Sequence, residues 1–190
     1  MIKYIPFRRG MVVLDGACDG GLMLERLLEV TASPWSVGTP PVDLAHVAPG
    51  RAAETEDGAL PFAAETFDAL LSKHALGRSE GRLLLVEAHR VLRPGGWLIG
   101  WEKRRAWRAW DGGGGRRALD EAGFVLRCQE PFDLLADRAA AILGRVPGIS
   151  HSLAARAAVQ GVFALDGLLL NLPALRRRSR HVIWVARKGP

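Results

Sequence analysis

The amino-acid sequence predicts an α/β protein with a doubly wound, mostly parallel sheet that carries helices on both faces. Two observations predict this class. Short apolar runs that suit buried strands alternate along the chain with segments of helical periodicity. The first of these runs, residues 11–15, ends in an acidic residue and leads through small residues into an amphipathic segment. With 190 residues, the chain is long enough to form one domain with its own core.

Strands are expected where apolar residues cluster between turn signals. The run at 11–15 suits a buried parallel strand, and prolines close the second strand because they cannot continue a hydrogen-bonded ladder. The expected strands cover residues 11–15, 34–41, 51–56, 66–72, 97–102, 124–128 and 181–188.

Helices are expected between these strands. The strongest helical pattern covers residues 79–92, where Ser79 can cap the start and an apolar stripe follows. Its members are Leu84, Leu85, Ala88, Val91 and Leu92. The Arg-Pro-Gly-Gly sequence at 93–96 should stop this helix sharply.

Other helical segments are shorter or less regular. Leu24, Leu27, Leu28 and Thr31 fall on one helical face, and residues 42–48 leave room for two turns at most. Four glycines at 112–115 predict a flexible hinge before a short helix at 116–122. The remaining segment, 131–180, is expected to be a helical insertion or cap within a single domain of residues 1–190.

Composition excludes several classes of protein. A hydrophobic fraction of 48% with 24% charged residues is ordinary for a soluble globular protein. No apolar segment reaches the roughly 20 residues needed to span a membrane, and the N-terminus lacks a signal-peptide core. Cys18 and Cys128 form neither a disulfide framework nor a zinc motif. We therefore expect a cytoplasmic protein without a bound metal.

The chain is basic, with a formal net charge of +6. Much of the excess lies in two runs, residues 102–110 and 176–180. Such clusters attract nucleic acid or anionic substrates, or simply form a solvated face. Arginine and tryptophan alternate in the first run, a combination that holds phosphates and stacks bases.

The predicted topology indicates where a ligand binds. In doubly wound sheets, ligands bind beyond the carboxyl ends of the strands, where the winding direction reverses. This rule places the loops after five strand ends around one crevice: Asp15, Gly38, Glu56, Ser72 and Glu102.

Several motifs occur in an order that resembles one known family. These are VVLDGACDGG (12–21), EDGALPFAAETFDALLSKHAL (56–76), EAHRVLRPGGWLIGWE (87–102), LDEAGF (119–124) and HVIWVARK (181–188). Together they resemble the class I S-adenosylmethionine-dependent methyltransferases, especially the small-molecule group similar to the ubiquinone and menaquinone methyltransferases. The resemblance implies a Rossmann-like, seven-stranded sheet whose last strand is antiparallel.

The resemblance also implies S-adenosylmethionine as cofactor and assigns positions to its contacts. Asp15 would support the ammonium of the methionine moiety, Thr39 stands near the ribose position, and Glu56 or Asp57 would accept from the adenine amino group. His74 is the nearest candidate for a catalytic base. The full set of expected cofactor contacts is Asp15, Gly16, Ala17, Asp19, Gly21, Thr39, Glu56, Asp57, Gly58 and Ser72.

The sequence departs from the family pattern in three respects. Ala17 and Asp19 replace two loop glycines, which normally let the backbone approach the ligand. Thr39 or Pro40 stands where an acid usually binds the ribose, although Asp43 lies close by. Only about ten residues precede Met11, where relatives carry covering helices.

These departures leave three hypotheses. The first is a small-molecule methyltransferase. The second is a catalytically inactive methyltransferase-like subunit that binds or stabilises a protein partner, in a homo- or heteromer. The third, an RNA methyltransferase, depends on the basic run at 102–110.

Overall fold

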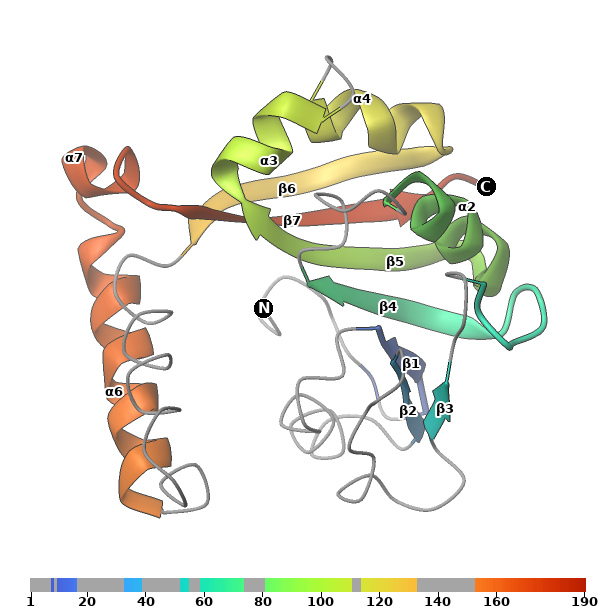
Figure 1. Cartoon of the computed structure of the whole chain (residues 1–190), viewed down its shortest axis with the longest axis horizontal. Coiled ribbons are helices and arrows are strands. Elements are labelled where there is room, and N and C mark those ends of the chain that lie inside the picture. Colours follow the sequence, from blue (N-terminus) through green and yellow to red (C-terminus); the bar gives the residue numbers. More distant parts are fainter. Residues whose placement is uncertain are drawn as a thin grey trace. The chain divides into compact units, whose positions relative to one another are not determined.

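The structure is a computed structural model that describes residues 8, 10–16, 33–38, 52–54, 59–73, 81–110, 114–132 and 153–190. From β4 onward, strands and helices alternate along the described chain, and the strands before β4 pair in parallel, which confirms the predicted α/β class (Figure 1). The strands are β1 (Val12–Asp15), β2 (Ser33–Gly38), β3 (Ala52–Glu54), β4 (Phe67–Lys73), β5 (Leu92–Lys103), β6 (Phe124–Phe132) and β7 (His181–Lys188). The helices are α2 (Gly81–Val91), α3 (Arg104–Ala109), α4 (Gly114–Glu121), α6 (Leu153–Leu169) and α7 (Pro173–Arg176).

The strands follow the order β3-β2-β1-β4-β5-β7-β6 across the sheet. The pairs β1–β2, β2–β3, β1–β4 and β4–β5 are all parallel. After β1, the chain adds β2 and β3 on one side and then returns to add β4 and β5 on the other. The winding direction therefore reverses between β1 and β4, which is the position where doubly wound sheets bind their ligands.

Strand β7 runs antiparallel to β5. Lys188, at the end of β7, donates from Nζ to the carbonyl of Leu92 at the start of β5, over 2.7 Å. The ring of Trp184, earlier in β7, lies against Gly100, later in β5. Because the contacts run in opposite order along the two strands, their directions are opposite. The family resemblance implies this direction for the last strand.

The core lies where the central strands are covered on both faces. Consecutive residues Val13 and Leu14 are both fully buried, as are Ala69 and Leu70 on the neighbouring strand β4. Burial on both faces explains why these strands read as continuous apolar runs. On α2, the predicted stripe is confirmed at its buried members Leu85, Ala88 and Val91.

Helix α2 ends just before the Arg-Pro-Gly-Gly segment, as predicted, but the segment itself belongs to a strand and not to a separate turn. Helix α2 ends at Val91 and β5 begins at once with Leu92, five residues before the predicted start. Phe67 pairs with Leu92 and Ala69 pairs with Trp97, so residues 93–96 stand opposite Asp68 alone. The segment is therefore a large bulge within β5, with four residues opposite one.

Side chains from two other strands hold this bulge in place. Arg93 Nη1 donates to Asp68 Oδ1 over 2.7 Å, and Asp68 Oδ2 accepts the backbone N–H of Val12 over 2.7 Å. Arg187 Nε donates to the carbonyl of Gly95 over 2.9 Å. The bulge is thus joined to strands β1, β4 and β7.

The glycine run also differs from its predicted role as a hinge. Gly114 and Gly115 belong to α4, while Gly112 and Gly113 lie outside the described residues. A Cβ atom at Gly115 would overlap the ring of Trp107 on α3. That ring is buried and stacks on Trp184, with centroids 5.5 Å apart. Gly115 is therefore needed for the close packing of α4 against Trp107. The local sequence does not reveal this packing partner.

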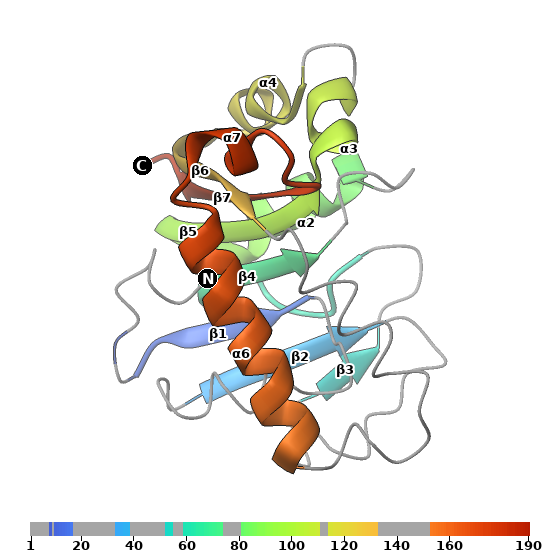
Figure 2. The ribbon, with the colours of Figure 1, turned by 90° about the vertical axis from the view of Figure 1, so that its left-hand side faces the viewer.

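The described chain divides into two compact units, Met1–Gln129 with Ile183–Pro190, and Glu130–Val182. In the second unit, α6 is a straight helix that leads through a short turn into α7 (Figure 2). Residues 131 and 132 belong to β6, so the helical region predicted for 131–180 starts later than expected. Among the described residues, no helix has the length and hydropathy required to cross a membrane.

We expect Gly115→Ala to lower the free energy of unfolding by about 1–3 kcal/mol, because the added methyl group overpacks the Trp107 contact. The control is Gly161→Ala on α6, where a Cβ atom meets nothing within 4 Å. This change should stabilise the protein by about 0.5–1 kcal/mol, through helix propensity. Denaturant unfolding measures both effects. Equal changes in the two variants would contradict the packing role of Gly115.

Candidate functional site

Buried polar side chains gather at the carboxyl ends of the central strands. Asp15, the last residue of β1, is fully buried, and Ser72, near the end of β4, is 2% exposed. The register pairs Asp15 with Leu71, so Asp15 and Ser72 lie one residue apart in register on adjacent strands. They flank the point where the winding reverses, which makes this edge the candidate binding site.

Gly16 continues β1 at this edge and lies very close to β4. Its backbone N–H donates to the carbonyl of Leu71 over 2.9 Å. A Cβ atom at this position would lie 2.9 Å from the same carbonyl oxygen, which is part of the rigid sheet. Gly16 is itself exposed. Its backbone thus borders the site without a side chain, as in loops that admit a ligand close to the main chain.

Ser72 carries a hydroxyl group whose hydrogen-bonding capacity is unused. Within the described part of the chain, Ser72 Oγ is buried and has no hydrogen-bond partner. Leaving a buried hydroxyl in this state costs about 1–3 kcal/mol. A hydroxyl both donates and accepts, so a polar ligand at this edge can satisfy it.

A second buried acid lies at this edge, at a strand end that the sequence places beside the crevice, but it is not among the predicted cofactor contacts. Glu102 is 1% exposed and lies near the end of β5, two residues beyond Gly100, which pairs with Ser72. The signal was present in the sequence, because the apolar run at 97–102 ends in an acid as the run at 11–15 does. The edge therefore has buried polar groups on β1, β4 and β5.

The structure brings together three of the predicted cofactor contacts, Asp15, Gly16 and Ser72. The other predicted site residues lie outside the described residues. These are Ala17, Asp19, Gly21, Thr39, Glu56, Asp57, Gly58 and His74. The described residues contain no group of three or more His, Cys, Asp or Glu side chains that could hold a metal ion.

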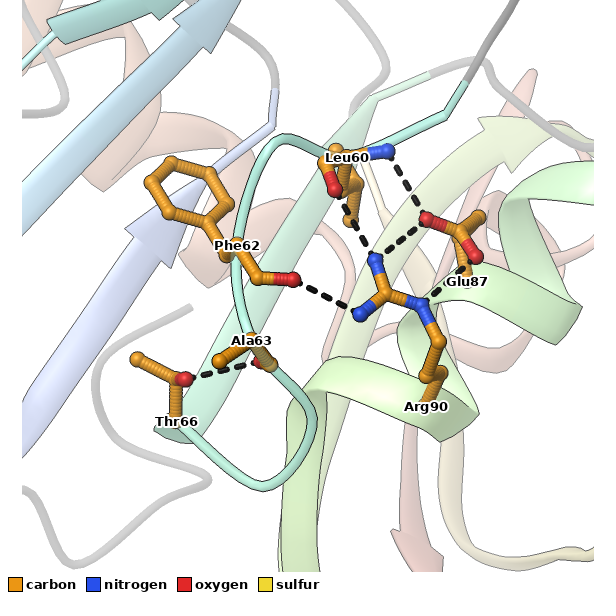
Figure 3. Close-up of polar contacts among 6 residues, drawn as sticks. All are labelled: Leu60, Phe62, Ala63, Thr66, Glu87 and Arg90. Carbon is orange, nitrogen blue, oxygen red and sulfur yellow. Dashed lines mark hydrogen bonds and ion pairs between the residues drawn. The ribbon is translucent and has the colours of Figure 1, made fainter.

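The loop that leads into β4 is fixed to helix α2 by one arginine and one glutamate (Figure 3). Arg90 donates from Nη1 to the carbonyl of Phe62 over 2.6 Å and from Nη2 to the carbonyl of Leu60 over 2.9 Å. Glu87 Oε2 accepts the N–H of Leu60 over 2.8 Å. These bonds position the described end of the segment that carries the predicted Glu56–Asp57–Gly58 contacts.

Glu87 and Arg90 also bind each other, one helical turn apart. Arg90 Nε and Nη2 donate to the two carboxylate oxygens of Glu87, over 2.8 and 2.7 Å. The hydrogen bond from Arg90 lowers the pKa of Glu87, assisted by the N–H of Leu60, while burial opposes the shift. The paired carboxylate is therefore stabilised in its charged form.

The basic run after β5 forms helix α3, but its first tryptophan is not available to a ligand. Trp107 is 4% exposed and stacks on Trp184 in the core. Arg105 and Arg108 are exposed on the same helix. The inward packing removes one of the two aromatic groups on which an RNA-stacking role depends.

Comparison with known families gives a match over the centre of the chain. Residues 14–100, from within β1 to within β5, match the family described as a methyltransferase domain. No curated protein matches the sequence. The matched region contains Asp15, Gly16 and Ser72, together with the Glu87–Arg90 pair.

Solved structures show the same fold at low sequence identity. The S-adenosylmethionine-dependent methyltransferase from Mesorhizobium loti is 17% identical, with a TM-score of 0.60, covering 98% of this chain and 95% of that one. A chain of the Haloferax volcanii complex that contains the Trm112 methyltransferase activator is 16% identical, with a TM-score of 0.63 and coverages of 100% and 87%. The 4+2 cyclase SpnF is 22% identical, with a TM-score of 0.60 and coverages of 96% and 76%.

We expect Glu87→Gln to lower the free energy of unfolding at neutral pH by about 1–2 kcal/mol, because the charge-assisted bonds to Arg90 are weakened. The matched control is Glu121→Gln, which removes the exposed pair with Arg117. That change should cost at most about 0.5 kcal/mol. Equal losses in denaturant unfolding would contradict the anchoring role of Glu87.

The Glu87 contribution should also depend on pH in a defined direction. The pKa of Glu87 in the folded protein lies below its ordinary value of 4.5. The stabilisation is therefore complete above about pH 4.5 and is lost as the pH falls through the folded pKa. The difference in stability between the wild type and Glu87→Gln should narrow over that acidic range.

Proposed function

The chain carries a class I S-adenosylmethionine-dependent methyltransferase domain, and we propose that it transfers a methyl group from S-adenosylmethionine to a small-molecule acceptor in the cytoplasm. The observation that supports this proposal most directly is the pair of buried polar side chains, Asp15 and Ser72, on the two strands where the winding reverses. The similarity of the motifs to the quinone methyltransferases favours a small acceptor.

The residues at this edge suit the cofactor chemically. The Asp15 carboxylate would hold the ammonium of the methionine moiety, the Gly16 backbone admits the ligand close to β1, and the Ser72 hydroxyl would gain a partner. The bound cofactor supplies an electrophilic methyl group on a sulfonium. The protein then has to align the acceptor and exclude water.

The remaining contacts are proposed from the motifs. Ala17, Asp19 and Gly21 would complete the loop after Gly16, and Thr39 would lie near the ribose. Glu56 or Asp57, followed by Gly58, would bind the adenine. His74 would accept a proton where the acceptor must lose one.

A catalytically inactive subunit is the second candidate. Asp19 places a side chain and a charge in the predicted loop, and the strand-two acid is absent. A chain of similar fold belongs to a complex that contains a methyltransferase activator. An RNA substrate is less favoured, because Trp107 is buried.

Isothermal titration with S-adenosylhomocysteine tests the proposed cofactor site. We expect the wild type to bind and Asp15→Asn to bind roughly tenfold to a hundredfold more weakly, since the substitution removes a charge-assisted hydrogen bond. Asp120→Asn, at an exposed position on α4, is the control and should bind as the wild type does. Circular dichroism checks that each variant is folded. Absence of binding by the folded wild type would favour the inactive-subunit candidate.

Ser72→Ala should separate ligand binding from stability. Removing a buried hydroxyl without a partner should leave the ligand-free protein as stable as the wild type or up to about 1 kcal/mol more stable. Affinity for S-adenosylhomocysteine should fall roughly 3- to 10-fold, because one hydrogen bond is lost.

Thr66→Ala is the matched control, because it should lower stability and leave the affinity for S-adenosylhomocysteine unchanged. Thr66 Oγ1 donates to the carbonyl of Ala63 over 2.8 Å, at the amino end of β4 (Figure 3). This variant should lose about 1 kcal/mol of stability and keep its affinity. A Ser72→Ala protein that is less stable and binds normally would contradict a binding role for Ser72.

A further inference from the structure

Helix α6 and the turn after it expose a stripe of apolar residues. At 100° per residue, the members of the stripe that belong to α6 lie within an arc of about 100°. Its largest members are Leu165, Leu168 and Leu172, which are 48%, 70% and 54% exposed. Smaller residues extend the same side of the helix; these are Ala157, Gly161 and Ala164, all exposed.

The polar side chain in this part of α6 is buried instead. Asp166 is only 3% exposed, although its neighbour Leu165 faces solvent. At these two positions the acidic residue lies inward and the leucine lies outward, opposite to the usual arrangement of a surface helix. Contiguous exposed leucines of this kind mark an interaction surface.

A cluster of arginines follows the stripe directly. Arg176, Arg177, Arg178 and Arg180 are all exposed, and no acidic residue occurs between Gly167 and Arg180. Arg177 and Arg178 line a shallow hollow together with the apolar residues Pro173, Ala174 and Leu175. Apolar and guanidinium groups thus meet in this hollow. The exposed residues Leu165 and Leu168 of α6, together with the exposed residues of 172–180 that follow them in the chain, are here called the α6–α7 surface.

We propose that the α6–α7 surface docks on an anionic phospholipid membrane. Guanidinium groups bind phosphate in a bidentate manner, and leucines beside them can enter the region between the headgroups and the acyl chains. Arginines near an anionic membrane each contribute binding energy that depends on salt. A second copy of this chain, with a net charge of +6, would bring like charge to the arginines. The proposal does not rest on methyl transfer.

Vesicle co-sedimentation of the full chain tests the proposal. We expect binding to vesicles of phosphatidylcholine with one quarter phosphatidylglycerol, and weak binding to phosphatidylcholine alone. The binding should weaken as salt is raised from 50 to 300 mM. Inorganic phosphate at matched ionic strength should not displace the protein from the vesicles. Phosphate can occupy the arginines, but it cannot replace the contact between the leucines and the acyl chains.

Two double variants separate the charge from the apolar stripe. Arg177→Gln/Arg178→Gln should weaken binding to anionic vesicles roughly 30-fold, from about 1 kcal/mol for each arginine. Leu168→Gln/Leu172→Gln should weaken it roughly tenfold or more. The matched control, Arg105→Gln/Arg108→Gln, removes two arginines of α3 that are also exposed and should change binding less than twofold. Thermal unfolding checks that each variant is folded.

Three outcomes would overturn the proposal. The first is no binding by the folded wild type to anionic vesicles. The second is an equal loss in both arginine variants, which would indicate attraction by net charge alone. The third is a wild-type protein that does not bind vesicles and sediments as a dimer, while Leu168→Gln/Leu172→Gln sediments as a monomer. That result would place a second copy of the chain on the stripe.

Discussion

The fold and the candidate site both depend on the close approach of β1 and β4 at Gly16. The hydrogen bond from Gly16 to Leu71 joins the two strands between which the sheet order reverses. The absence of a Cβ atom permits this bond and also leaves the main chain accessible at the strand end. One residue thus satisfies a packing requirement of the sheet and also suits the ligand proposed for this edge.

Buried polar side chains stand at the carboxyl ends of the two central strands. Apolar residues fill the interior of β1 and β4, whereas Asp15 and Ser72 stand at the ends. A folded protein gains little from a buried hydroxyl without a partner, so its position points to a ligand rather than to stability. The fold does not fix the reaction, since one protein of similar fold is a 4+2 cyclase.

The sequence predicts well what depends on local pattern. The buried strands and helix α2 were found within a few residues, because apolar periodicity and burial coincide there. The bulge at 93–96 was missed because it depends on the register with β4, and Pro-Gly-Gly alone reads as a turn. Gly115 was read as flexible because its packing partner, Trp107, lies on another helix.

Only the part of the site that depends on local sequence pattern could be predicted. Asp15, Gly16 and Ser72 follow from the rule on strand ends, and Glu102 fits that rule equally well. The Glu87–Arg90 pair was not recognised as an anchor, since its partners Leu60 and Phe62 are 27 to 30 residues away in the chain. The motifs alone support the contacts expected at Thr39 and at 56–58, which lie outside the described residues.

The carboxylate of Asp68 has a consequence for how such a protein can change over evolution. It fastens β1 and the bulge of β5 to β4 near the amino ends of these strands, at the edge opposite Asp15 and Ser72. Assembly of the central strands is therefore secured by groups that a ligand at the carboxyl edge does not touch. Substitutions in the loops at the carboxyl edge would leave the Asp68 bonds intact. A homologue could therefore lose catalytic activity and keep the same fold.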